Sequence, residues 1–113
     1  MPTIKRISSR AKGKNGELEL AEFMRQHGYP GAFRGQQFHG GAESPDVVVP
    51  GLEGIHVECK RVESGSLYNW LEQAINDAGS EKVPVVMHRK SRKGWVAIMR
   101  LEDLLNILLV SGI

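Results

Sequence analysis

The apolar and polar positions of the chain follow two different periods, and the first clear one is that of a helix. From Lys14 to His27, a helical wheel at about 100° per residue gathers four apolar side chains on one side, namely Leu20, Ala21, Phe23 and Met24. Gly28 follows as a C-terminal cap. Glu17 falls close to the middle of this apolar side, where a carboxylate costs free energy unless it is paired or binds a metal. The alternative is a first-turn carboxylate that favours the positive end of the helix dipole and reaches solvent.

The second period is that of two short strands joined by a Pro50-Gly51 turn. Asp46 opens the first apolar run, and Glu58-Cys59-Lys60 closes the second. Because side chains alternate along a strand, His56, Glu58 and Lys60 share one face, and the opposite face is apolar. The sequence therefore predicts paired strands that each present one carboxylate.

Two carboxylates and a lysine in this arrangement suit phosphodiester hydrolysis. Paired carboxylates hold a hard cation such as Mg²⁺, which takes oxygen ligands, and the lysine adds a fixed positive charge near a bound phosphate. The alternative is a solvent-facing strand with a surface ion pair, because an Asp followed by Glu-x-Lys is a short pattern.

The remaining pattern predicts a strand at residues 32–38 and a polar, glycine-rich loop before Asp46. A helix is expected from Leu67 to Ala78 with Ser66 as N-cap and a buried stripe of Leu67, Trp70, Leu71, Ala74 and Ile75. Strands at 83–88 and 95–99 flank a basic hairpin loop. Residues 101–110 form a last helix with more leucines than one face needs, so it either meets another chain or is a fully packed closing helix.

Composition narrows the class of protein. The chain has 113 residues, enough for one small domain. Its single cysteine excludes an intramolecular disulfide and a zinc cluster, which favours a reducing cytoplasm. No apolar run is long enough to span a bilayer, and no signal-peptide core is visible.

The net charge of the chain is only +2, but its basic residues are concentrated in two clusters. Residues 1–16 hold Lys5, Arg6, Arg10, Lys12 and Lys14, and the hairpin loop holds Arg89, Lys90, Arg92 and Lys93. Separated basic clusters favour a polyanion such as nucleic acid, although solubilising tails and turns look the same. We expect residues 1–13 to be a flexible basic arm and residues 14–113 to be the folded domain.

The ordered set of motifs resembles the PD-(D/E)xK nuclease superfamily, and within it the archaeal-type Holliday junction resolvases and their small relatives in phages and bacteria. The set runs through Lys12-Gly13 before Glu17, Arg34 before the glycine-rich loop, Ser44-Pro45-Asp46, Glu58-Cys59-Lys60 and Gln73-Ala74. The resemblance implies a single α/β domain of restriction-endonuclease-like fold, with a central mixed sheet flanked by helices in the order α-β-β-β-α-β-β-α.

The resemblance also implies the roles of the site residues. Asp46, Glu58 and the main-chain carbonyl of Cys59 would bind the metal, and Glu17 would complete the metal site through a second ion. Lys60 would orient the attacking water. Gln73 would support the site. Archaeal members carry a catalytic serine in the glycine-rich segment, where this chain has Ser44 displaced and His39 as a stand-in. Backbone phosphates would be held by the two basic clusters together with Arg34 and Arg61.

The function implied is a Mg²⁺-dependent homodimer, with Mn²⁺ as a substitute, that makes symmetric paired nicks in four-way DNA junctions. No membrane and no small-molecule cofactor are expected. Two alternatives stay open: a related nuclease that cuts flaps, forks or single-stranded DNA, and an inactive subunit that binds branched DNA.

Overall fold

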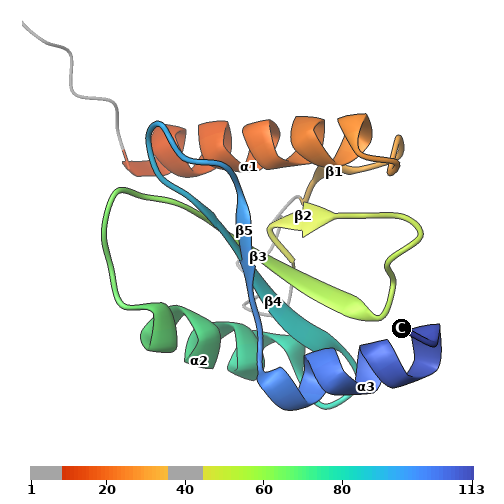
Figure 1. Ribbon diagram of the computed structural model, residues 1–113. Helices are drawn as coiled ribbons and strands as arrows, with labels where there is room; N and C mark the ends of the chain where they lie inside the picture. The colour runs from red at the N-terminus through yellow and green to blue at the C-terminus, as the bar shows by residue number, and fades with distance from the viewer. Residues whose placement is uncertain (1–8, 36–44) are drawn as a thin grey trace, which may run out of the picture.

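The computed structural model describes residues 9–35 and 45–113 (Figure 1). For residues 9–12 it describes the backbone only. The elements follow one another as α1 (Ser9–Gln26), β1 (Phe33–Arg34), β2 (Val47–Val48), β3 (Ile55–Arg61), α2 (Leu67–Ala78), β4 (Val83–Arg89), β5 (Val96–Ile98) and α3 (Leu101–Ser111). This is the predicted order of helices and strands. The predictions that concern residues 1–8 and 36–44, among them His39 and Ser44, lie outside the described residues.

The central sheet is mixed, as predicted. Its strand order is β3-β4-β5, with β3 parallel to β4 and β4 antiparallel to β5. Strands β1 and β2 form a separate antiparallel pair. The amide of Asp46 donates to the carbonyl of Val57 at 2.9 Å, so the residue that opens β2 lies directly beside the middle of β3.

Helices α1 and α2 lie on opposite sides of this sheet (Figure 1). The apolar side of α1 supplies Leu20, Ala21 and Met24 to the core, where Val57 of β3 meets them. Close approach is possible because Gly16 lacks a side chain: a Cβ there would lie 2.5 Å from the Cβ of Arg61. The same packing brings Glu17 next to the end of β3.

Several boundaries differ from the prediction. Helix α1 begins at Ser9 rather than Lys14, so it extends into the expected basic arm. Ser66 caps α2 as predicted, its hydroxyl accepting from the Asn69 amide at 3.4 Å. The buried stripe of α2 was predicted too wide, because Ala74 alone is buried and Leu67 is 47% exposed. Helix α2 packs mainly on β4, and the part of β3 that it also meets carries Glu58 and Lys60 rather than apolar side chains.

Helix α3 is not the fully packed closing helix that was one of the two alternatives. None of its residues is buried. Leu101, Leu105 and Leu109 are exposed at 67%, 50% and 80%, and they recur every four residues along one face.

No helix in the described part of the chain is long and apolar enough to cross a membrane.

Candidate active site

Strands β2 and β3 bring the two predicted carboxylates together. Asp46 accepts a hydrogen bond through Oδ2 from the Cys59 amide at 2.8 Å, so its carboxylate lies against the peptide between Glu58 and Cys59. Glu58 is buried, with 5% of its surface exposed. The two carboxylates are therefore close together, as expected. The predicted pairing of their two strands was wrong, because β2 pairs with β1 and β3 pairs with β4.

Glu58 has polar neighbours that the sequence did not assign to the site. His56 Nε2 lies 2.9 Å from Glu58 Oε1, and the imidazole is buried with 1% exposed. Asp77 of α2 joins them, and the possible ligand atoms of these three residues all lie within 4.8 Å of one another. The alternation of β3 placed His56 on the Glu58 face, but no local signal connected Asp77, which reaches β3 only through the packing of α2.

Burial and charge act together on Glu58. Its pKa is raised to about 7, first because burial disfavours the charged form and then because Asp46 and Asp77 are close by, while the hydrogen bond from His56 acts in the opposite direction. Three carboxyl groups in one partly buried place repel one another when ionised. A divalent cation relieves that repulsion, so the residues fit a metal.

The donor set fits a hard cation better than a soft one. Asp46 and Glu58 supply carboxylate oxygens, and the Cys59 peptide beside Asp46 supplies the main-chain carbonyl that the resemblance implied. The thiol of Cys59 is an unsuitable ligand, because it packs against the apolar core and burial raises its pKa.

Lys60 lies on the same face of β3 as Glu58, as expected. Its Nζ donates to Gln73 Oε1 at 3.4 Å across to α2. Gln73 therefore contacts the candidate catalytic lysine directly, which agrees with the supporting role implied for it.

Glu17 is half-buried and paired with an arginine. Arg34 Nε donates to Glu17 Oε2 at 2.5 Å, and the two side chains are exposed at 35% and 16%. Burial raises the pKa of Glu17 although Arg34 acts to lower it, and Asp46 contributes in the raising direction. The acid on the apolar side of this helix is thus paired with Arg34, which is one of the explanations that the sequence offered.

The basic residues expected to contact DNA fall into two groups. Arg34, Arg61 and Arg89 are already paired: Arg61 Nε lies 3.4 Å from Glu19 Oε2, and Arg89 also binds Glu19. The second group is exposed and consists of Lys14, Lys90, Arg92 and Lys93. Lys5 and Arg6 lie outside the described residues, and Arg10 and Lys12 are described only as part of α1.

A family model described as "Phage putative PDDEXK endonuclease" matches residues 8–111 of the chain. The chain belongs to this endonuclease family. The predicted resemblance to the PD-(D/E)xK superfamily and to its phage members is thereby confirmed. No curated protein and no solved structure matches the chain.

Family membership is consistent with the geometry around β3. The amide of Asp46 is hydrogen-bonded to the carbonyl of Val57, so the Pro45-Asp46 segment lies beside the strand that carries Glu58-Cys59-Lys60. Nucleases of this superfamily generally use divalent metal ions, which agrees with the crowding of carboxyl groups around Glu58.

Proposed function

We propose that this PD-(D/E)xK endonuclease is a Mg²⁺-dependent Holliday junction resolvase, in which two copies of the chain cut opposed strands of a four-way DNA junction. Mn²⁺ would substitute for Mg²⁺. The observation that carries the proposal is the apolar face of α3, which is exposed in the described part of the chain, because paired nicks need two active sites held in one assembly.

Within each active site, the chain's own residues position the metal and the reacting groups. Asp46, Glu58 and the Cys59 carbonyl would hold the cation, which supplies charge stabilisation at the scissile phosphate and an activated water. Lys60, held by Gln73, would orient that water and stabilise charge on the phosphate. Glu17 would act through Arg34, keeping its guanidinium at the edge of the site.

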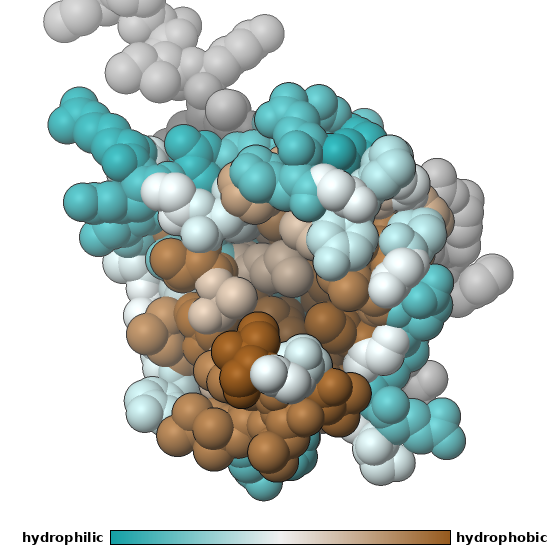
Figure 2. All heavy atoms as spheres, turned by 45° about the vertical axis from the view of Figure 1, so that its right-hand side comes forward, coloured by the Kyte–Doolittle hydropathy of each residue, from teal (hydrophilic) through white to brown (hydrophobic). Residues whose placement is uncertain are grey.

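The dimer would form through α3. Figure 2 shows apolar side chains gathered on one face of the molecule, and the exposed apolar residues of α3 are Leu101, Leu104, Leu105, Ile107, Leu109, Val110 and, just beyond it, Ile113. A contiguous apolar surface of this kind is uncommon on a monomer. A second copy of the same helix offers a complementary apolar surface, since an isologous contact uses the same patch twice.

Cleavage of a labelled synthetic four-way junction in Mg²⁺, beside linear duplex, fork and flap controls of equal length, tests the proposal. We expect paired symmetric nicks in the junction and none with the Lys60→Ala protein. Preferential cutting of the fork or flap would reassign the enzyme to that class of nuclease. Junction binding without cleavage in Mg²⁺ or Mn²⁺ would identify a binding subunit instead.

The oligomeric state tests α3 separately. We expect sedimentation to show a dimer of the wild-type chain and a monomer of the Leu105→Glu variant. Tyr68→Glu is the matched control, because Tyr68 is 85% exposed on α2. A monomeric wild-type chain at the concentration that gives paired nicks would remove α3 from the proposal.

A further inference from the structure

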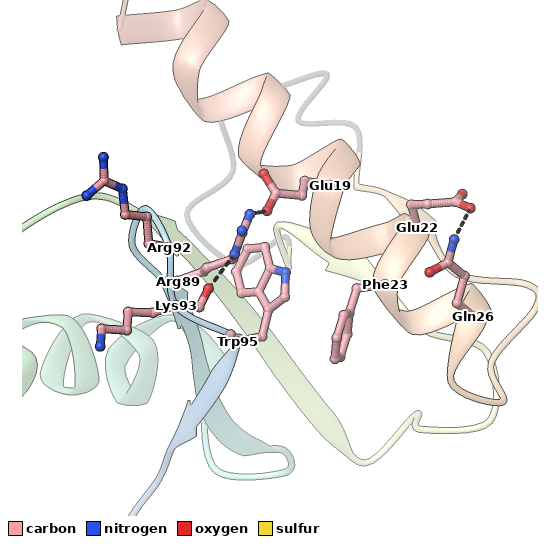
Figure 3. Close-up of a pocket in the computed structure, with 9 residues that line it drawn as sticks. Glu19, Glu22, Phe23, Gln26, Arg89, Arg92, Lys93 and Trp95 are labelled. Atoms are coloured by element: carbon pink, nitrogen blue, oxygen red, sulfur yellow. Dashed lines mark hydrogen bonds and ion pairs between the residues drawn. The ribbon is translucent and has the colours of Figure 1, made fainter.

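A hollow lies between α1 and the loop that joins β4 to β5, outside the group of acids around Glu58 (Figure 3). Its volume is about 650 Å³, inside the roughly 300–1,000 Å³ range of small-molecule sites. Phe23 of α1 and Trp95 line it, with ring centroids 6.5 Å apart and planes inclined by 50°. The hollow therefore offers aromatic surface to a flat ligand.

Two cations lie on the loop that lines the hollow. Arg92 and Lys93 are exposed there, and neither forms an ion pair with any residue that the structure describes. Their side chains extend from the loop away from Trp95 (Figure 3). They are free to meet an anion on the outer side of the loop, beside the hollow.

The acids that line the hollow already have partners. Glu19 binds Arg89 and Arg61. Glu22 pairs with Arg25 at 2.8 Å and accepts from Gln26 at 3.1 Å. Because both carboxylates are neutralised within the chain, they oppose an incoming phosphate only weakly.

We propose that this hollow binds one unpaired nucleotide of the DNA, with the base against Trp95 and the adjoining phosphate near Arg92 and Lys93. Aromatic surface beside cations is the combination that binds single strands, since every base has a stacking face. A base inside a duplex is covered by its neighbours on both faces. Bases at a branch point lose a stacking neighbour, so they are the ones most available to the hollow.

The hollow is connected to the active site through ion pairs. Arg61 directly follows Lys60 on β3, binds Glu19, and Glu19 in turn binds Arg89 in the wall of the hollow. Helix α1 thus carries Glu17 to the active site and Glu19 to the hollow. This inference rests on the proposed function, because that function makes DNA the ligand. It adds that the recognised feature of the DNA is one unpaired nucleotide.

Equilibrium binding to two DNA substrates tests the inference. One is a labelled linear duplex, and the other is a labelled three-way branched DNA of the same total length with a single unpaired thymidine at the branch. The Lys60→Ala background keeps the DNA uncut. We expect Trp95→Leu, which keeps apolar volume but removes the aromatic face, to weaken binding of the branched substrate by roughly 5- to 150-fold, the range for one base–aromatic stack. Binding of the plain duplex should stay unchanged.

Two further variants separate stacking from folding. Trp95→Phe should restore most of the affinity for the unpaired nucleotide, and Tyr68→Leu, an exposed aromatic on α2, should change neither affinity. Equal losses on both substrates, or no loss on either, would overturn the inference, and so would failure of Trp95→Phe to restore binding when its melting temperature matches wild type.

The wild-type chain is tested for cleavage in parallel. Junction cleavage without any Trp95-dependent difference would overturn the nucleotide site alone. Trp95-dependent binding without cleavage of any substrate would overturn the proposed function alone.

Discussion

The two glutamates of the candidate active site, one half-buried and one buried, are stabilised in different ways. Glu17 has a guanidinium partner, Arg34, at 2.5 Å. Glu58 forms no ion pair with a described lysine or arginine; its neighbours are the imidazole of His56 and the carboxyl groups of Asp46 and Asp77. Both carboxyl groups have a raised pKa, but only that of Glu58 reaches about 7.

The difference favours one location for the metal. A charged group in a partly buried place needs a counter-charge; Glu17 has the guanidinium of Arg34, whereas Glu58 has the imidazole of His56 beside it. We expect a divalent cation at Asp46 and Glu58 to supply the positive charge there. At Glu17 it would have to displace Arg34. We therefore expect one cation per chain, bound on the Glu58 side.

The largest effect is expected where a ligand charge is removed beside Glu58. Asp46→Asn should lower cleavage by about 10³-fold or more, because the cation that stabilises charge at the phosphate is lost. Junction binding should change little, since phosphate contacts are made elsewhere. The measurement is single-turnover cleavage beside a binding titration, with Glu72→Gln, an exposed acid of α2, as control. Retained cleavage would refute the assignment of Asp46.

His56 tests how the Glu58 carboxylate is held. Its Nε2 is hydrogen-bonded to Glu58 Oε1, so His56→Leu should weaken Mn²⁺ binding by about 10- to 100-fold, the usual cost of losing a partner that orients a metal ligand. His56→Gln retains a donor and should recover much of the affinity. Calorimetric titration of the DNA-free protein with Mn²⁺ measures this directly. Equal Mn²⁺ affinities of the wild type and His56→Leu would show that His56 contributes to packing and not to metal binding.

The pKa of Glu58 makes metal binding depend on pH. Below about pH 7 the carboxyl group carries a proton that the cation must displace, so Mn²⁺ affinity should fall by up to about tenfold per pH unit. Between pH 4.5 and about 7, Glu58 is protonated in the metal-free folded chain but ionised in the unfolded chain. The stability of the metal-free fold should therefore decrease as pH rises through that window. Melting temperatures without metal, compared with those of Glu58→Gln, check the second effect.

The sequence predicted the Glu58 side of this site more completely than the Glu17 side, for a physical reason. Alternation along β3 is a local property, so it placed Glu58 and Lys60 on one face and assigned Cys59 to the other. The helical wheel marked Glu17 as an acid that needs a partner. Neither pattern could identify that partner as Arg34, because Arg34 meets Glu17 only when β1 packs beside α1.

The same limit applies to the helices. The bounds of α2 followed from its N-cap and its glycine, but its exposure depended on how the helix packs on β4 and β3. For α3 the leucines indicated a helix, and the structure was needed to show that nothing in the described chain covers them.

The smallest effect is expected on the Glu17 side, where the chain provides the cation. Glu17→Gln should lower cleavage by about tenfold, the cost of one charge-assisted hydrogen bond to Arg34, and should leave one Mn²⁺ bound per chain. Arg34→Lys keeps the positive charge but loses the planar guanidinium group, so its cleavage rate should lie between those of Glu17→Gln and the wild type. Calorimetric stoichiometry is the deciding measurement. Two cations on the wild type and one on Glu17→Gln would show that a metal displaces Arg34, and the contrast between the two glutamates would disappear.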